Sequence, residues 1–412
     1  MRMHASTPTA EEASQPTDEW CLSHGYRIPR WLSKYGVWCP FKRGILFQGR
    51  YGTINCRCVG DGERVLSFHG LNASHSAFDE LSGVLEDNKY TVVSFDLYGH
   101  GLSAIPRYDI FGSNYSLDFF VDQADEVLEH FGLHERPLSV IGISMGACLA
   151  AAFCDRHPER VERMILISPA GIIRRRPFMV KAIRLLHWLI PCIPYCVSRC
   201  CFSRKLPAGR MDNMTNHMMW RFFVTPKSIS GILGIVKRLP MWNSSALYQR
   251  VGALCKPTLI MFGAKDTVTP PTSAPTFKSY FTNSHIIIFP DACHLVSYLM
   301  PSEIASTSLA FLGTPPDSNV SDYARWLPFS EDGSYIKEKE RVILHHARES
   351  PLPPHTHTAN TATNIAPGNQ MYPIERMFSL PRPNGSAKRA FDASLVLVTL
   401  SDYEKSSQNE SF

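Results

Sequence analysis

A five-residue motif with a glycine at each end places the strongest constraint on the fold of this chain. Gly142-Ile143-Ser144-Met145-Gly146 follows the apolar run Leu138-Ser139-Val140-Ile141, which we expect to be a strand, and opens a helical run that extends to Arg156. A serine in this strand–turn–helix setting is typical of a tight, strained turn that lifts the hydroxyl clear of the sheet. Only glycine at the flanking positions lets strand and helix approach so closely. The motif therefore predicts a nucleophilic serine, Ser144, and the dipole of the following helix favours an oxyanion beside it.

Apolar strands alternate with amphipathic helices on both sides of this motif. The chain of 412 residues is 44% hydrophobic and 19% charged, which is enough apolar material for a full core. Alternation of this kind predicts βαβ units, and hence an α/β fold with a mainly parallel sheet flanked by helices. We expect strands over 53–59, 65–68, 91–95, 138–142, 164–167, 257–262 and 285–289, and helices over 76–86, 117–131, 145–156 and 302–311.

The alternation is interrupted once, over Ile172 to Arg250, where the pattern is helical and lies between two expected strands, as an inserted lid does. Beyond Gly313 the chain is rich in Pro, Ser, Thr, Asn and His, a composition typical of disorder. Trp20, Trp31 and Trp38 indicate that the second half of the N-terminal segment packs against something. These patterns predict an N-terminal extension (1–43), a first part of the core (44–171), a helical basic lid (172–250), a second part of the core (251–313) and a mostly disordered tail (314–412).

The expected lid differs in charge from the rest of the chain. It carries fourteen basic residues and one acid, Asp212, for a net charge of +13; because the whole chain carries +5, the remainder carries −8. The basic residues are interleaved with aromatic ones such as Trp188 and Trp220. This composition suits a membrane–water interface or an anionic substrate. The alternative is a lid with a merely solvated basic face. No motif of a nucleic-acid-binding fold accompanies the charge, so we expect no nucleic acid as partner.

Three further motifs resemble those of the α/β-hydrolase superfamily, and the resemblance extends over about residues 50–312. Phe68-His69-Gly70-Leu71-Asn72 looks like the family's oxyanion loop, Asp96 to Ser103 like its D-x-x-G-x-G-x-S stretch, and His157 to Val161 like its H-P-E-R-V link. The resemblance implies an α/β-hydrolase fold with the backbone amides of Leu71 and Met145 as the oxyanion hole. It also implies structural roles for the two latter stretches, including His100 and His157, while His69 shapes the oxyanion loop.

Two residues late in the chain complete the expected site. Asp266 follows the strand expected over 257–262, and His294 follows the strand expected over 285–289. The order Ser144, Asp266, His294 agrees with the superfamily's order of nucleophile, acid and base. A serine hydroxyl is a poor nucleophile unless an imidazole removes its proton, and the imidazole needs an acceptor that fixes its tautomer. Asp291 is the alternative acid, although it lies close to His294 in sequence and away from the expected strand end.

The resemblance implies a serine hydrolase similar to monoacylglycerol lipases, which cleaves a carboxylic ester with an apolar acyl chain through an acyl-enzyme on Ser144, with no cofactor and no metal. The alternatives are a thioesterase or a C–C bond hydrolase with the same triad, or a non-catalytic binding protein on the same scaffold. Epoxide hydrolases and haloalkane dehalogenases are disfavoured because they carry Asp at the position of Ser144. The expected partners are a small lipid-like ester and, through the basic lid, the surface of a membrane.

The sequence also indicates a cellular location. The polar first eighteen residues lack the order of a secretory signal, and no run of eighteen or more uncharged apolar residues is present. Twelve cysteines in such a chain predict thiols, mostly buried, rather than a disulfide framework. We therefore expect an intracellular protein, cytoplasmic or peripherally bound to a membrane. Two interpretations remain for Cys192, Cys196, Cys200 and Cys201: they are either buried thiols or sites of palmitoylation.

Overall fold

An eight-stranded sheet forms the centre of the protein in the computed structural model, which describes residues 15–33, 36–173, 181–182, 185–190, 216–217 and 219–335. The strand order is β1-β2-β4-β3-β5-β6-β7-β8. The pairs β1–β2 and β2–β4 are antiparallel, and all other neighbouring pairs are parallel. This topology confirms the predicted α/β class. The strands are β1 (Ile45–Gly49), β2 (Gly52–Val59), β3 (Glu63–Phe68), β4 (Tyr90–Phe95), β5 (Leu138–Ile143), β6 (Val161–Ile167), β7 (Thr258–Gly263) and β8 (Ser284–Phe289).

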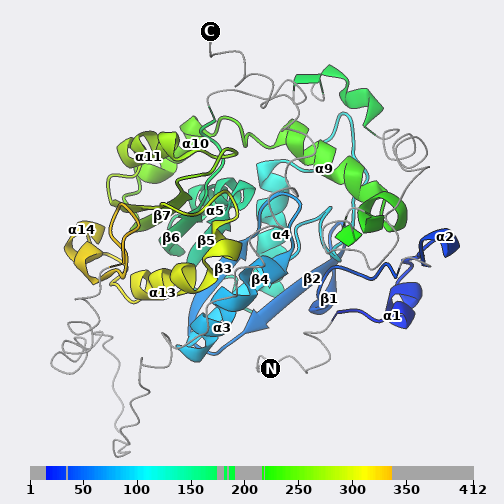
Figure 1. Ribbon diagram of the computed structural model, residues 1–412, viewed down its shortest axis with the longest axis horizontal. Helices are drawn as coiled ribbons and strands as arrows, with labels where there is room; N and C mark the ends of the chain where they lie inside the picture. The colour runs from blue at the N-terminus through cyan, green and yellow to red at the C-terminus, as the bar shows by residue number, and fades with distance from the viewer. Residues whose placement is uncertain are drawn as a thin grey trace, which may run out of the picture.

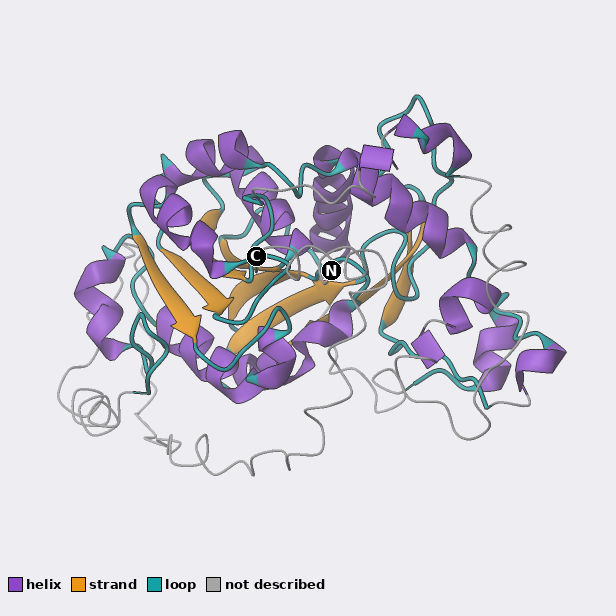
Figure 2. Cartoon of the chain, turned by 45° about the horizontal axis from the view of Figure 1, so that its top comes forward, coloured by secondary structure: helices purple, strands orange, loops and turns teal. Residues whose placement is uncertain are grey.

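Helices cover both faces of the sheet (Figures 1 and 2). On one face, Phe153 of α5 lies in the same apolar cluster as side chains of α4, α10 and α11; on the other, Leu85 of α3 shares a second cluster with Ile304 of α13. Every residue of β4, β5 and β7 is buried, because strands covered on both sides consist of nearly continuous apolar runs. The helices of these layers are α3 (Asp79–Asp87), α4 (Leu117–His130), α5 (Met145–Arg156), α10 (Ser245–Gly252), α11 (Ala274–Tyr280) and α13 (Pro301–Leu312).

The chain between β6 and β7 is helical where the structure describes it. It includes η2 (His187–Leu189), η3 (Trp220–Val224) and α9 (Lys227–Arg238), and its two ends meet in a bridge between Ile172 and Asn243. A Cβ atom at Gly231 of α9 would lie 3.3 Å from the Cα atom of Gly99, so this helix packs closely on the loop after β4. The predicted helical insertion is therefore present in these segments, and its action as a lid stays a prediction. The remainder of the range 172–250 lies outside the described residues.

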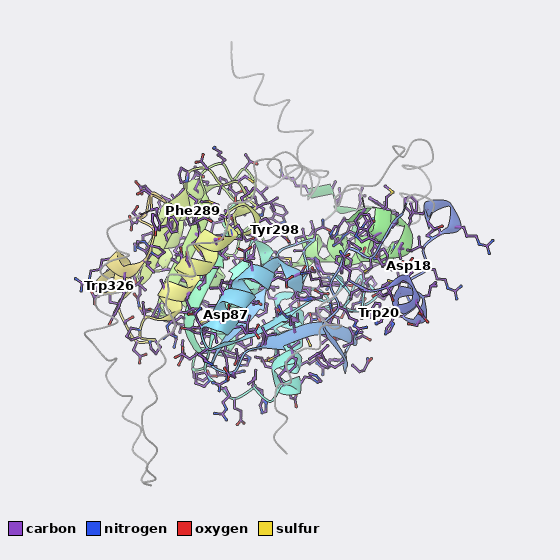
Figure 3. All side chains as sticks on the ribbon, turned by 60° about the horizontal axis from the view of Figure 1, so that its bottom comes forward. Asp18, Trp20, Asp87, Phe289, Tyr298 and Trp326 are labelled. Carbon is purple, nitrogen blue, oxygen red and sulfur yellow. The ribbon has the colours of Figure 1, made fainter. Side chains whose placement is uncertain are left out.

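The N-terminal segment packs against this insertion. Trp38 pairs with Asn216 twice: its backbone N–H donates to Oδ1 over 3.1 Å, and its carbonyl accepts from Nδ2 over 3.0 Å. Cys21 and Phe41 share an apolar cluster with Trp220 of η3. Figure 3 shows Trp20 on this blue segment beside the green insertion, at the opposite end of the molecule from Trp326. The predicted packing of the extension is thus observed. Its helices are α1 (Asp18–Ser23) and α2 (Arg30–Ser33).

The predicted boundary at 313 is wrong, because residues 314–335 continue the core. Phe329 is buried, with its ring centroid 5.3 Å from that of Phe289 in β8. The carbonyl of Thr314 accepts a hydrogen bond of 2.8 Å from Nε of Arg163, a side chain that is itself buried. A few apolar anchors among polar residues are too sparse to show a period, which is why composition alone predicted a tail. This segment contains α14 (Val320–Tyr323) and η5 (Ala324–Trp326), and residues 336–412 lie outside the described part.

The described cysteines are free thiols, and most of them are buried, as predicted. The four cysteines between 192 and 201 lie outside the described residues. Within the described ranges, no helix has the length and apolar character needed to cross a membrane.

Candidate active site

Ser144 lies at the turn between β5 and α5 in a conformation that side-chain-bearing residues rarely adopt, with φ +55° and ψ −115°. A Cβ atom at Gly142 would lie 2.4 Å from the carbonyl oxygen of Gly146, and one at Gly146 would lie 2.0 Å from that of Phe68. Both positions therefore require glycine. The strained turn holds the Ser144 side chain partly exposed at the carboxyl edge of the sheet, as the motif predicts.

A chain of hydrogen bonds connects the three predicted side chains. Nε2 of His294 lies 3.0 Å from Oγ of Ser144, and Nδ1 of the same ring lies 2.8 Å from Oδ2 of Asp266. The imidazole is 8% exposed and the carboxylate is fully buried. Strands β5, β7 and β8 are parallel, so the loops that follow them meet at one edge of the sheet. The structure thus brings Ser144, Asp266 and His294 together although up to 150 residues separate them.

The alternative acid lies elsewhere. The side chain of Asp291 is 83% exposed, and its Oδ1 is 3.0 Å from Nζ of Lys265. Asp266, in contrast, accepts hydrogen bonds at Oδ1 from the backbone N–H groups of Val268 and Thr269, both over 2.8 Å. These donors compensate the burial of its charge.

Thr269 is a residue of the site that the sequence reasoning missed. The hydroxyl of Thr269 donates to Oδ2 of Asp266 over 2.8 Å. Oγ1 of Thr269 also lies 3.1 Å from Nδ1 of His294 and 3.1 Å from the carbonyl oxygen of Ser168. The side chain is buried. Thr269 therefore connects the loops that follow β6, β7 and β8. The signal in the sequence is the spacing Asp-x-x-Thr, because an Asp side chain commonly binds amides two and three residues ahead.

The predicted oxyanion loop passes directly over Ser144. A Cβ atom at Gly70 would lie 3.3 Å from that of Ser144, so the neighbouring Leu71 is brought to the nucleophile. The turn is closed by the N–H of Ala73, which donates to the carbonyl of Gly70 over 3.2 Å, and Asn72 within it has φ +65°. Of the two predicted amide donors, Leu71 follows the glycine that packs against Ser144, and Met145 is the next residue after Ser144 in the chain.

The buried side chain of His69 holds this loop in place. Its Nδ1 lies 2.8 Å from the carbonyl oxygen of Gly70, and its Nε2 accepts a hydrogen bond of 3.0 Å from the N–H of Leu97. The ring is therefore the neutral Nδ1–H tautomer. Complete burial lowers the pKa of His69 to about 4, although Asp96 opposes the shift. This arrangement matches the predicted role of His69 in shaping the loop.

The D-x-x-G-x-G-x-S stretch is structural, as predicted. Asp96 is fully buried and accepts hydrogen bonds from Nδ2 of Asn55 over 2.7 Å and from the backbone N–H of His75 over 2.7 Å. Burial raises its pKa, but the charges of His75 and His69 and the hydrogen bonds from His75 and Asn55 together outweigh burial and leave the pKa of Asp96 at about 2. His100 is buried beside His69, with ring centroids 5.1 Å apart, and His157 contacts Asp125. Neither of the two touches the triad.

A sequence model of the family described as serine aminopeptidase, S33, matches residues 62–297, which is more than half of the chain. The chain belongs to this family. The matched range of the hydrolase includes Ser144, Asp266 and His294. Within the part of the chain that the structure describes, no group of three or more His, Cys, Asp or Glu side chains could hold a metal ion.

Individual proteins that are similar to this hydrolase include a lipase, a dehalogenase and two esterases. It is 24% identical over 281 residues to monoacylglycerol lipase abhd6-B of Xenopus laevis, a match that covers 62% of this chain and 77% of the relative. It is 25% identical over 282 residues to haloalkane dehalogenase 2 of Mycobacterium tuberculosis, with 65% and 94% covered. The fold is similar to that of the esterase EaEST from Exiguobacterium antarcticum, with TM-score 0.50 and 19% identity over 66% of this chain and 100% of the other. An esterase from Thermogutta terrifontis gives TM-score 0.51 and 20% identity over 65% and 97%.

Proposed function

We propose that the hydrolase cleaves carboxylic esters with an apolar acyl chain through an acyl-enzyme on Ser144. The observation that carries this proposal is the hydrogen-bond chain from Oγ of Ser144 through His294 to the buried carboxylate of Asp266. Such a chain activates a hydroxyl for attack on a carbonyl carbon. A non-catalytic binding protein has no use for this buried, fully connected arrangement.

In the proposed mechanism each group has its own role. His294 takes the proton of Ser144 at Nε2 while Oγ forms a bond to the acyl carbon, and the N–H groups of Leu71 and Met145 stabilise the resulting oxyanion. The protonated His294, paired with Asp266, then gives this proton to the leaving alcohol as the ester C–O bond breaks. In the second half, His294 takes a proton from water, the hydroxide attacks the acyl-enzyme, and Ser144 regains its proton as the carboxylic acid leaves.

The proposed substrate is a lipid ester such as a monoacylglycerol. The similarity to a monoacylglycerol lipase supports this class, and so does the high content of apolar residues in the sequence of the insertion. Halogen displacement, as in the dehalogenase named above, is disfavoured because a carboxylate forms the covalent intermediate in such enzymes and this chain has Ser144 at the elbow. Thioester and C–C bond hydrolysis use the same triad and are therefore included in the test.

A fluorophosphonate probe and a substrate panel test the proposal. We expect the purified protein to be labelled and to hydrolyse medium- and long-chain monoacylglycerols faster than matched acyl thioesters or β-diketones. Ser144→Ala should abolish both labelling and turnover, with a loss on the order of 10⁴-fold or more. Ser279→Ala, on the exposed face of α11, is the matched control and should change neither. Labelling without turnover of any ester, or turnover that survives Ser144→Ala, contradicts the proposal.

A second proposal concerns contact with anionic membranes through the insertion. Leu185 and Trp188 are 76% and 57% exposed, and Phe111 in the loop before α4 is 97% exposed. The segment 185–190 and the loop of Phe111 both contact α9. The carbonyl of Ile190 accepts a hydrogen bond from Oγ of Ser230, and the carbonyl of Ile110 accepts one from Arg238. Exposed apolar side chains in and beside a segment of net charge +13 suit the interface of an anionic bilayer.

Co-sedimentation with vesicles tests this contact. We expect the protein to bind vesicles that contain phosphatidylserine, and to be released as salt shortens the Debye length from about 10 Å at 0.1 M to about 3 Å at 1 M. Trp188→Ala and Phe111→Ala should each weaken binding, whereas Leu254→Ala, a partly exposed control near the end of α10, should not. Equal binding to neutral vesicles, or binding that ignores salt and both variants, overturns the proposal.

A further inference from the structure

The guanidinium of Arg221, in the insertion, is buried without a carboxylate. The residue is 7% exposed, and no Asp or Glu within the described ranges lies within ion-pair distance of it. Its Nε–H has no hydrogen-bond partner, and the hydrogen bond that the guanidinium does make, from its terminal NH2 group to the carbonyl of Asn72, is long at 3.3 Å. A guanidinium has five N–H donors, and few acceptors in the described part of the chain lie within reach of those of Arg221.

The surroundings of Arg221 do not balance its charge. The centroid of the Phe41 ring lies 5.8 Å from Cζ of Arg221. Burial, followed by the charge of Arg221 itself, lowers the pKa of His217 to about 4, so this neighbour is neutral. The carboxylate of Asp96 acts only from a distance and is already bound by its own donors. Burial lowers the pKa of Arg221 to about 10, so the group still carries its positive charge at neutral pH.

This charge contacts the loop that carries the proposed oxyanion donor. Asn72 directly follows Leu71, the proposed oxyanion donor, and Asn72, Leu71 and Ser144 are all partly exposed. A ligand on Ser144 therefore lies against the same loop that Arg221 touches from the insertion. Burying an unpaired charge costs several kcal/mol, so an unpaired guanidinium held against the oxyanion loop is suited to binding an anion.

From this juxtaposition, and on the basis of the proposed esterase activity, we infer that Arg221 binds an anionic group of the substrate. The group is an oxyanion, a carboxylate or a phosphate, carried by the ester close to its scissile bond. Its oxygens accept charge-assisted hydrogen bonds from Nε–H and the terminal N–H groups, as guanidinium–oxyanion pairs do. The preferred substrates are therefore anionic esters, and a neutral monoacylglycerol is the less favoured member of the class.

Matched pairs of esters test the inference. On the alcohol side, 1-butyrylglycerol is compared with 1-butyrylglycerol 3-phosphate; on the acyl side, p-nitrophenyl pentanoate is compared with the p-nitrophenyl monoester of glutaric acid. We expect kcat/KM for the anionic member of at least one pair to exceed that for the neutral member by about 10-fold or more, as for a hydrogen bond to a charged group. The pair that responds shows whether phosphate or carboxylate is bound.

Three arginine variants separate binding from a structural role. Arg221→Met should remove the preference, and Arg221→Lys should retain part of it because the charge is kept. Arg238→Met is the control, since Arg238 also comes from the insertion, lies over an aromatic ring and donates to carbonyls, but at the loop of Asp109. If Arg221→Met does not fold, competitive inhibition of the wild-type protein by glycerol 3-phosphate, compared with glycerol, provides the measurement instead.

The outcomes distinguish this inference from the proposed function. Equal kcat/KM within both pairs, or a preference that survives Arg221→Met, overturns the inference while neutral-ester hydrolysis still supports the esterase. An equal loss for neutral and anionic esters in Arg221→Met shows that Arg221 only positions the oxyanion loop, and this also overturns it. Absence of hydrolysis for all four esters contradicts the proposed function itself.

Discussion

Replacing Thr269 by valine removes one hydroxyl from the site and little volume. The hydroxyl donates to Oδ2 of the buried Asp266 and its oxygen lies 3.1 Å from Nδ1 of His294. A hydrogen bond to a charged group contributes about 1.5–3 kcal/mol. The charge of Asp266 matters most when His294 becomes protonated in the transition state, so most of this loss should raise the barrier. Because each 1.4 kcal/mol is tenfold in rate, kcat should fall about 10–100-fold, with KM almost unchanged.

The assay is steady-state hydrolysis of a soluble ester by wild type, Thr269→Val and Thr269→Ser, with thermal unfolding as the check on folding. Serine keeps the hydroxyl and should restore most of kcat, whereas valine keeps the branched shape and should not. The free energy of unfolding should also fall in Thr269→Val, since a buried hydrogen bond to the carboxylate of Asp266 is lost. A valine variant with wild-type kcat, or a serine variant as slow as the valine one, refutes the reasoning.

Three further predictions follow from the same structure. Asp266→Asn should lower kcat by about 10⁴-fold because the amide favours the wrong tautomer of His294, whereas Asp291→Asn should leave turnover nearly unchanged; the reverse ranking would move the acid. A chain ending at 313 should unfold at a clearly lower temperature than one ending at 335, because it lacks Phe329, and equal melting would contradict this. Acid should destabilise the fold between pH 6.5 and 4, because the pKa of His69 falls from 6.5 unfolded to about 4 folded, so the unfolded state binds its proton first. His69 alone should make the free energy of unfolding about 3 kcal/mol larger above pH 6.5 than below pH 4. A free energy of unfolding, measured with urea, that does not change with pH would disprove this.

Much of the fold could be predicted because the patterns are local. Strand β5 and helix α5 were expected within one residue of their observed bounds, since period and glycine spacing report burial and turn geometry within short windows. Strand β1 was missed because its apolar run, Ile45 to Phe47, is only three residues long and does not alternate with polar residues, although the strand is partly buried at the edge of the sheet. The packed segment 314–335 was missed for a different reason, since its few apolar residues are far apart in the sequence and become buried only in the tertiary structure.

The site divides in the same way. Ser144, Asp266 and His294 follow from the motif and from their order along the chain, because each lies shortly after a strand that the sequence predicts. The choice between Asp266 and Asp291, the place of Thr269 and the contact of Arg221 with Asn72 depend on which loops meet at the carboxyl edge of the sheet. Arg221 and Asn72 are 149 residues apart, and only the strand order and the return of the insertion over β4 bring them together. Local sequence therefore determined the nucleophile and its turn, whereas the tertiary packing decided which charges surround it, because electrostatic interactions depend on distance in space.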